Sequence, residues 1–183
     1  MPIGGTSAGL AVLGEFLFSA ANGTVTSNEA LANPYGRRVT LDRDFFTFPL
    51  MAQVITDSHF VERDRMGRFV TFLARLVQDG WSAAPKGIAI DSETAVLVQP
   101  SGAATVVANP GDATPFAYFV RGAGAPQEVA PKTPLTYLSL PVYRVTPGAT
   151  FNLATWTGSG GTAYTVSASA GVLTSTQAGG AIY

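Results

Sequence analysis

The sequence predicts an α/β fold for its first half and a β-rich second half. In the first half, two short predicted strands, residues 54–57 and 87–90, flank a longer segment whose apolar residues recur at helical spacing. Past about residue 94, β-branched and alternating runs separated by Gly, Pro, Ser and Asn replace this pattern. This change in sequence pattern divides the chain into residues 1–94 and residues 95–183.

The helices of the first half follow in order. Residues 8–21 carry apolar side chains at helical spacing and end at an Asn-Gly pair, which predicts a helix that stops there. Ser27 is the predicted N-cap of a short helix that must stop before the next proline. Residues 62–79 give the clearest helix, because their apolar residues form one stripe and a glycine follows as a stop signal.

The strands differ between the halves. The strands predicted at residues 54–57 and 87–90 contain the continuous apolar runs Val54-Ile55 and Gly87–Ile90, which are typical of central strands in a parallel sheet that is covered on both faces. The second half predicts further strands, at residues 95–98, 105–108, 116–120, 135–145, 151–156 and 163–166.

Composition excludes several function classes. The 183 residues fit one domain, and a net charge of −1 provides no basic field to attract nucleic acid or an anionic membrane. The absence of Cys excludes disulfides, thiolate metal sites and a cysteine nucleophile. No apolar run reaches the roughly 18 residues of a membrane span. We therefore expect no nucleic-acid or membrane partner.

A serine motif lies near the start of the chain. Gly5-Thr6-Ser7-Ala8-Gly9 matches the G-x-S-x-G pattern of a nucleophile elbow, a sharp strand-to-helix turn that presents the serine hydroxyl. Small neighbours relieve the crowding of such a turn, and a backbone N–H beside the serine, here that of Ala8, can stabilise an oxyanion. The alternative is an ordinary turn built from small residues.

The only histidine in the chain supplies the candidate base. His59 follows the strand at residues 54–57, and ligand-facing residues of an α/β sheet lie at the ends of such strands. A third group should orient the imidazole, and Asp91, Ser92 and Glu93 follow the next strand. The alternatives are an isolated structural histidine and a turn in which these three residues only cap the strand.

Three arginines begin the helix predicted after His59. On a helix, Arg68 aligns with Asp64 on a solvated face with an i,i+4 pair. Arg65 aligns with apolar residues, and a buried arginine is costly unless it meets an anion. Beside a nucleophile and a base, a substrate carboxylate is the natural anion for Arg65 to hold in bidentate fashion.

Four sequence blocks from residue 4 to residue 95 carry these groups: GGTSAG, DSHF, ERDRMGR and GIAIDSETA. In this order they resemble the cyanophycinase and peptidase E family of serine exopeptidases. The resemblance implies a three-layer α/β sandwich around a mainly parallel sheet, of the class I glutamine-amidotransferase type. It also implies a Ser-His-Glu triad without metal or cofactor, which cleaves next to aspartyl residues in peptides or in the β-linked aspartyl-arginine polymer cyanophycin.

Residue by residue, Ser7 matches the family's nucleophile and His59 its base. The substrate-gripping segment of the family matches five further positions, Asp57, Ser58, Arg63, Arg65 and Arg68.

The sequence departs from the family's pattern at two positions of the site. Ser58 stands where cyanophycinases usually have Gln, and Ser92 stands where the triad Glu usually follows the strand's Asp91. We predict that Glu93, one residue later, is the triad acid rather than Asp91.

Only Pro2-Ile3-Gly4 leads into the motif, so we expect a truncated enzyme that begins at its nucleophile motif. Residues 1–94 would be the C-terminal half of the catalytic domain, and residues 95–183 its β-rich remainder with an extension. A homodimer and export in bacteria are further expectations, and the alternative functions are another Ser-His ester or amide hydrolase and an inactive fragment.

Overall fold

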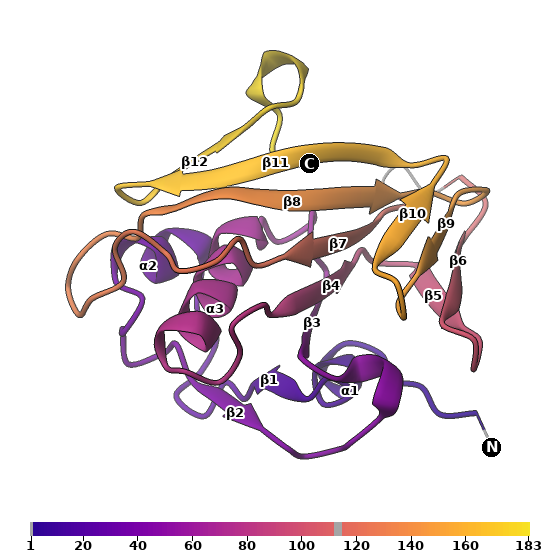
Figure 1. The fold of residues 1–183 in the computed structure, drawn as a ribbon, viewed down its shortest axis with the longest axis horizontal. Helices are drawn as coiled ribbons and strands as arrows, with labels where there is room; N and C mark the ends of the chain where they lie inside the picture. The colour runs from indigo at the N-terminus through magenta and orange to yellow at the C-terminus, as the bar shows by residue number, and fades with distance from the viewer. Residues whose placement is uncertain (1, 112–114) are drawn as a thin grey trace.

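The computed structural model describes residues 2–111 and 115–183, which form two β-sheets and a few helices (Figure 1). The larger sheet has eight strands, which from edge to edge are β12 (Val172–Ser175), β11 (Thr162–Ser169), β8 (Tyr137–Val145), β7 (Ala117–Arg121), β4 (Lys86–Ile90), β3 (Val54–Ser58), β1 (Phe16–Phe18) and β2 (Leu41–Arg43). The smaller sheet has four, β10 (Thr157–Ser159), β9 (Thr150–Asn152), β6 (Ala103–Ala108) and β5 (Thr94–Val98).

The larger sheet is mixed, so the predicted mainly parallel sandwich is wrong. Only two pairs are parallel, β3 with β1 and β3 with β4, and every other pair in either sheet of the described chain is antiparallel. Parallel pairing needs a crossover, usually a helix, whereas antiparallel strands can be joined directly. After β4 the sequence has strand-length runs but no stretch of helical period, so the chain adds strands in the antiparallel direction.

Different layers cover the two faces of the larger sheet. Helices α2 (Ser27–Ala32) and α3 (Met66–Gln78) pack on one face, where Phe69 and Leu73 of α3 share a core with Ile55. The smaller sheet and helix α1 (Ala8–Ala11) cover the other face, where Phe119 of β7 stacks on Phe151 of β9 with ring centroids 3.8 Å apart. Figure 1 shows the smaller sheet at one end of the larger one, away from α2 and α3.

The predicted helix over residues 8–21 is largely wrong. Only Ala8–Ala11 is helical, and β1 begins at Phe16. Between them the chain presses against β3, because a Cβ added at Gly14 would lie 2.5 Å from the carbonyl oxygen of Val54. Pairing of β1 with β3 thus overrides the local helical pattern.

The other predicted elements of the first half form with shifted ends. The predicted N-cap Ser27 is the first residue of α2, and the cap is Thr26, whose side chain forms a capping box with Glu29. Helix α3 begins at Met66 rather than at residue 62, because a turn with Asp64 at φ 46° precedes it. The strands predicted at residues 54–57 and 87–90 are β3 and β4.

The second half supplies strands to both sheets. β7, β8, β11 and β12 continue the larger sheet beyond β4, whereas β5, β6, β9 and β10 form the smaller one. The segments 1–94 and 95–183 therefore share one central sheet. Among the described residues, no helix combines the length and the apolar character that crossing a bilayer requires.

Candidate functional site

Ser7 lies in a strained turn immediately before α1. Its backbone has φ 51° and ψ −119°, a region that costs a non-glycine residue about 1–3 kcal/mol. Backbone hydrogen bonds hold the turn, from Gly9 N–H to Thr6 O at 2.8 Å and from Leu10 N–H to Ser7 O at 3.1 Å. Gly5 must be glycine, because an added Cβ would lie 2.1 Å from Gly9 O.

His59 lies at the end of β3 and reaches the hydroxyl of Ser7. Its Nε2 is 3.3 Å from Ser7 Oγ, within the loose hydrogen-bond range of a nucleophile–base pair without substrate. Thr56, on the same strand, donates a hydrogen bond to Leu10 O at 2.8 Å and so fixes α1 beside β3. The two residues that the sequence predicts as nucleophile and base are thus brought together, although 52 positions separate them.

The carboxylate that faces His59 is Glu62, not the predicted Glu93. Glu62 Oε2 and Ser92 Oγ each lie 3.1 Å from His59 Nδ1, and the Ser92 hydroxyl also donates to Glu62. Glu93 instead accepts a hydrogen bond from Asn109 Nδ2 at 3.1 Å, and no described contact joins it to His59. Its left-handed backbone, with φ 55°, belongs to the turn between β4 and β5.

Asp91, the other predicted acid, is buried and supports the loop that carries His59. Its Oδ1 accepts a hydrogen bond from the backbone N–H of Val61 at 2.6 Å. This bond ties the end of β4 to the segment between His59 and Glu62.

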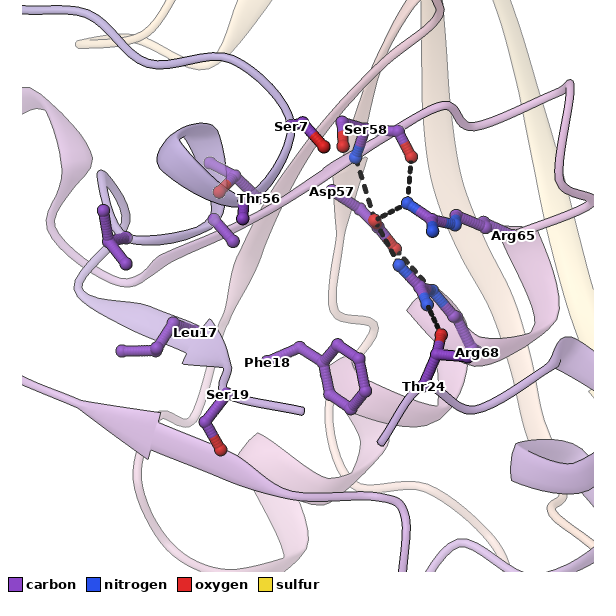
Figure 2. Close-up of a pocket in the computed structure, with 13 residues that line it drawn as sticks. Ser7, Leu17, Phe18, Ser19, Thr24, Thr56, Asp57, Ser58, Arg65 and Arg68 are labelled. Atoms are coloured by element: carbon purple, nitrogen blue, oxygen red, sulfur yellow. Dashed lines mark hydrogen bonds and ion pairs between the residues drawn. The ribbon is translucent and has the colours of Figure 1, made fainter. Parts of the chain in front are cut away.

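Arg68 is buried, so its predicted place on a solvated face is wrong. It is only 4% exposed, and its Nε and Nη2 donate to the two oxygens of Asp57 at 2.8 and 2.5 Å (Figure 2). Its Nη1 donates to Thr24 Oγ1 and to Val25 O, both at 3.3 Å, and its guanidinium carbon lies 5.1 Å from the ring centroid of Phe18. The guanidinium group of Arg68 therefore forms its hydrogen bonds with other groups of the protein.

Arg65 also contacts Asp57 but keeps part of its guanidinium toward the pocket. Its Nη1 donates to Asp57 Oδ1 at 3.1 Å and to Ser58 O at 2.5 Å, and no described hydrogen bond uses its Nε or Nη2. Burial lowers the pKa of Arg65, while the nearby Asp57 carboxylate opposes this shift. Of the other predicted substrate contacts, Ser58 lines the pocket, whereas Arg63 is exposed and outside it.

A pocket of about 280 Å³ opens beside Ser7. Figure 2 shows Ser7 and Ser58 at one edge and the Asp57–Arg65–Arg68 cluster along one side. The remaining wall is partly apolar, from Val12, Leu17 and Phe18. The pocket can present the Ser7 hydroxyl and one cation to a substrate of modest size, while His59, which is not among the lining residues, contacts that hydroxyl from beside the pocket.

Hydrogen bonds keep Glu62 ionised. The pKa of Glu62 is lowered chiefly by the hydrogen bond from Ser92 and next by the contact with His59. An ionised Glu62 is an acceptor for a proton on His59 Nδ1, which leaves the Nε2 lone pair for Ser7. Among the residues described, no group of three or more His, Asp or Glu side chains is placed to hold a metal ion.

No protein-family model and no curated protein matches this chain.

Besides the burial of Arg68, sequence reasoning missed the partner of the imidazole. Glu62 lies three residues after His59, a spacing that brings two side chains together wherever the chain makes a single turn. That spacing was the available signal, although the segment was predicted as the start of a straight helix.

Proposed function

We propose that this protein is a serine hydrolase that cleaves amide bonds next to aspartyl residues, with Ser7 as nucleophile and His59 as general base. The observation that carries the proposal is the 3.3 Å approach of His59 Nε2 to the hydroxyl of Ser7, which stands in a strained turn before α1. Strain at a nucleophile is typical of serine hydrolases, because the turn exposes the hydroxyl.

The chemistry follows from these positions. Ser7 Oγ attacks the substrate carbonyl carbon while its proton passes to His59 Nε2, and the carbonyl oxygen becomes an oxyanion. The backbone N–H of Ala8 has no hydrogen-bond partner among the described residues and is the expected oxyanion donor. The protonated His59 then gives its proton to the leaving amine, and water activated by His59 releases the acyl group from Ser7.

The pocket supports an acidic substrate. The unused guanidinium nitrogens of Arg65 can hold a carboxylate, and a pocket of about 280 Å³ suits one aspartyl side chain and the bond beside it. The resemblance to cyanophycinases and peptidase E favours aspartyl peptides, with cyanophycin as the leading substrate. Ser58, in place of the family's usual Gln, separates this site from typical cyanophycinases.

A second candidate function is the hydrolysis of a neutral ester or amide. The apolar wall formed by Val12, Leu17 and Phe18 favours this reading, because it can bury an uncharged acyl group.

The test is turnover of cyanophycin, an aspartyl dipeptide and a neutral ester by the wild type and by single and double variants. Ser7→Ala and His59→Ala should each lower the rate by several orders of magnitude, and the double variant should lose little more. Ser19→Ala is the matched control, because Ser19 lines the same pocket but has no histidine contact. Additive losses, or an unchanged rate in Ser7→Ala, would contradict the proposal, and a preference for the ester would favour the second function.

A further inference from the structure

The loop between β3 and α3 turns back on itself immediately after His59. The N–H of Arg63 donates to the carbonyl oxygen of His59 at 3.2 Å, and the N–H of Arg65 donates to Phe60 O at 2.9 Å. The left-handed backbone of His59, with φ 49°, starts this turn. The turn brings the side chains of residues 59 and 62 together.

Ser92 is the third residue of a hydrogen-bonded cluster that it forms with His59 and Glu62. Its hydroxyl hydrogen is donated to Glu62, and its oxygen lies 3.1 Å from His59 Nδ1, as does Glu62 Oε2. A proton on Nδ1 therefore meets two oxygen acceptors, while Nε2 faces Ser7. We propose that Glu62, held in place by Ser92, is the positioning carboxylate of the site, which fixes the tautomer and orientation of His59.

The neighbouring acids have other partners. Asp91 accepts from the N–H of Val61, and Glu93 accepts from Asn109. The charged group next to Glu62 is Arg63, which is exposed and helps to keep Glu62 ionised. The side chain of Glu62 is itself 56% exposed, so water weakens its interaction with His59 relative to a buried carboxylate.

The inference rests on the proposed function for its kinetic test. Glu62→Gln should lower kcat by about 10- to 100-fold with KM nearly unchanged, the scale of one charge-assisted hydrogen bond. The loss should fall short of the roughly 10⁴-fold that follows replacement of a buried triad aspartate by its amide. The matched control is Glu93→Gln, which makes the same chemical change in the turn between β4 and β5. It should leave kcat within about twofold of the wild type. Ser92→Ala should give a smaller loss than Glu62→Gln.

A second readout needs no substrate. Because His59 is the only histidine in the chain, selective ¹⁵N-histidine labelling reports its ring nitrogens without assignment. At a pH where the ring is neutral, the wild type and Glu93→Gln should show the proton on Nδ1. In Glu62→Gln the side-chain amide can donate to Nδ1, so the tautomer should shift toward a proton on Nε2.

The two readouts separate the two claims. A tautomer shift in Glu62→Gln without any turnover by the wild type would support the role of Glu62 and count against the proposed function. An unchanged tautomer in Glu62→Gln, or a loss of kcat in Glu93→Gln but not in Glu62→Gln, would overturn the role of Glu62.

Discussion

Replacing Asp57 by Asn should destabilise the protein more than most single changes in its charged residues. The carboxylate is 6% exposed and accepts from the guanidinium groups of both Arg65 and Arg68, as well as from the N–H of Ser58 at 2.8 Å. Asp57→Asn keeps the shape of the side chain but removes the one carboxylate that these two arginines contact within the part of the chain that the structure describes.

The magnitude follows from burial. Removing one partner of a buried ion pair costs about 3–5 kcal/mol, because the remaining charge stays desolvated. Arg68 is 4% exposed, so it cannot turn to water without opening the contacts that Thr24 and Phe18 make with it. Arg65, at 13% exposed, can relax more easily. We therefore expect the free energy of unfolding to fall by about 3–5 kcal/mol, most of it through Arg68.

Urea unfolding followed by tryptophan fluorescence measures this change, with equal slopes showing that the folded states are comparable. Asp79→Asn is the matched control, because Asp79 also pairs with an arginine, Arg75 at 2.8 Å, but the two side chains are 21% and 14% exposed. The control should lose less than Asp57→Asn, because Asp79 pairs with a single arginine and both side chains of that pair keep more contact with water. A loss below about 1 kcal/mol in Asp57→Asn, or equal losses in the two variants, would refute the structural role given to the cluster.

Three further predictions concern Arg65, the serine turn and Tyr183. Arg65→Lys should raise the activation free energy of kcat/KM by about 1.5–3 kcal/mol for an aspartyl substrate and leave that for a neutral ester unchanged. Equal losses of kcat/KM on the two substrates would mean that Arg65 has only a structural role. Gly5→Ala should reduce the rate by about 100-fold, because its Cβ would displace the turn, whereas Gly9→Ala, which meets open space, should keep it. Tyr183→Phe should cost about 1–3 kcal/mol in urea unfolding, since its hydroxyl accepts from the N–H of Met66 at 2.9 Å, and an unchanged stability would contradict this.

The local features of the site were predictable from the sequence. The approach of His59 to Ser7 was expected because a small-residue serine turn and a strand-terminal histidine are local patterns, and strands β3 and β4 contain the apolar runs Val54-Ile55 and Gly87–Ile90. Helix α3 was predicted from its apolar period, although the turn that precedes Met66 was predicted as part of the helix.

The missed features depend on partners far away in the chain. Arg68 is buried because Thr24 and Val25, in the connection between β1 and α2, cover it. The spacing of residues along α3 gives no sign that this segment packs against the helix. β1 replaced a predicted helix because it pairs with β3. The direction of β7 next to β4 follows from the connection between them rather than from the composition of either strand.

The most direct measurement of the central claim is labelling with a fluorophosphonate, followed by mass spectrometry of the modified peptide. If Ser7 is a nucleophile activated by His59, the wild type and Ser19→Ala should carry one label, on Ser7. Ser7→Ala should carry none, and His59→Ala should react far more slowly. No label on the wild type, a label on another serine, or an unchanged labelling rate in His59→Ala would contradict the account.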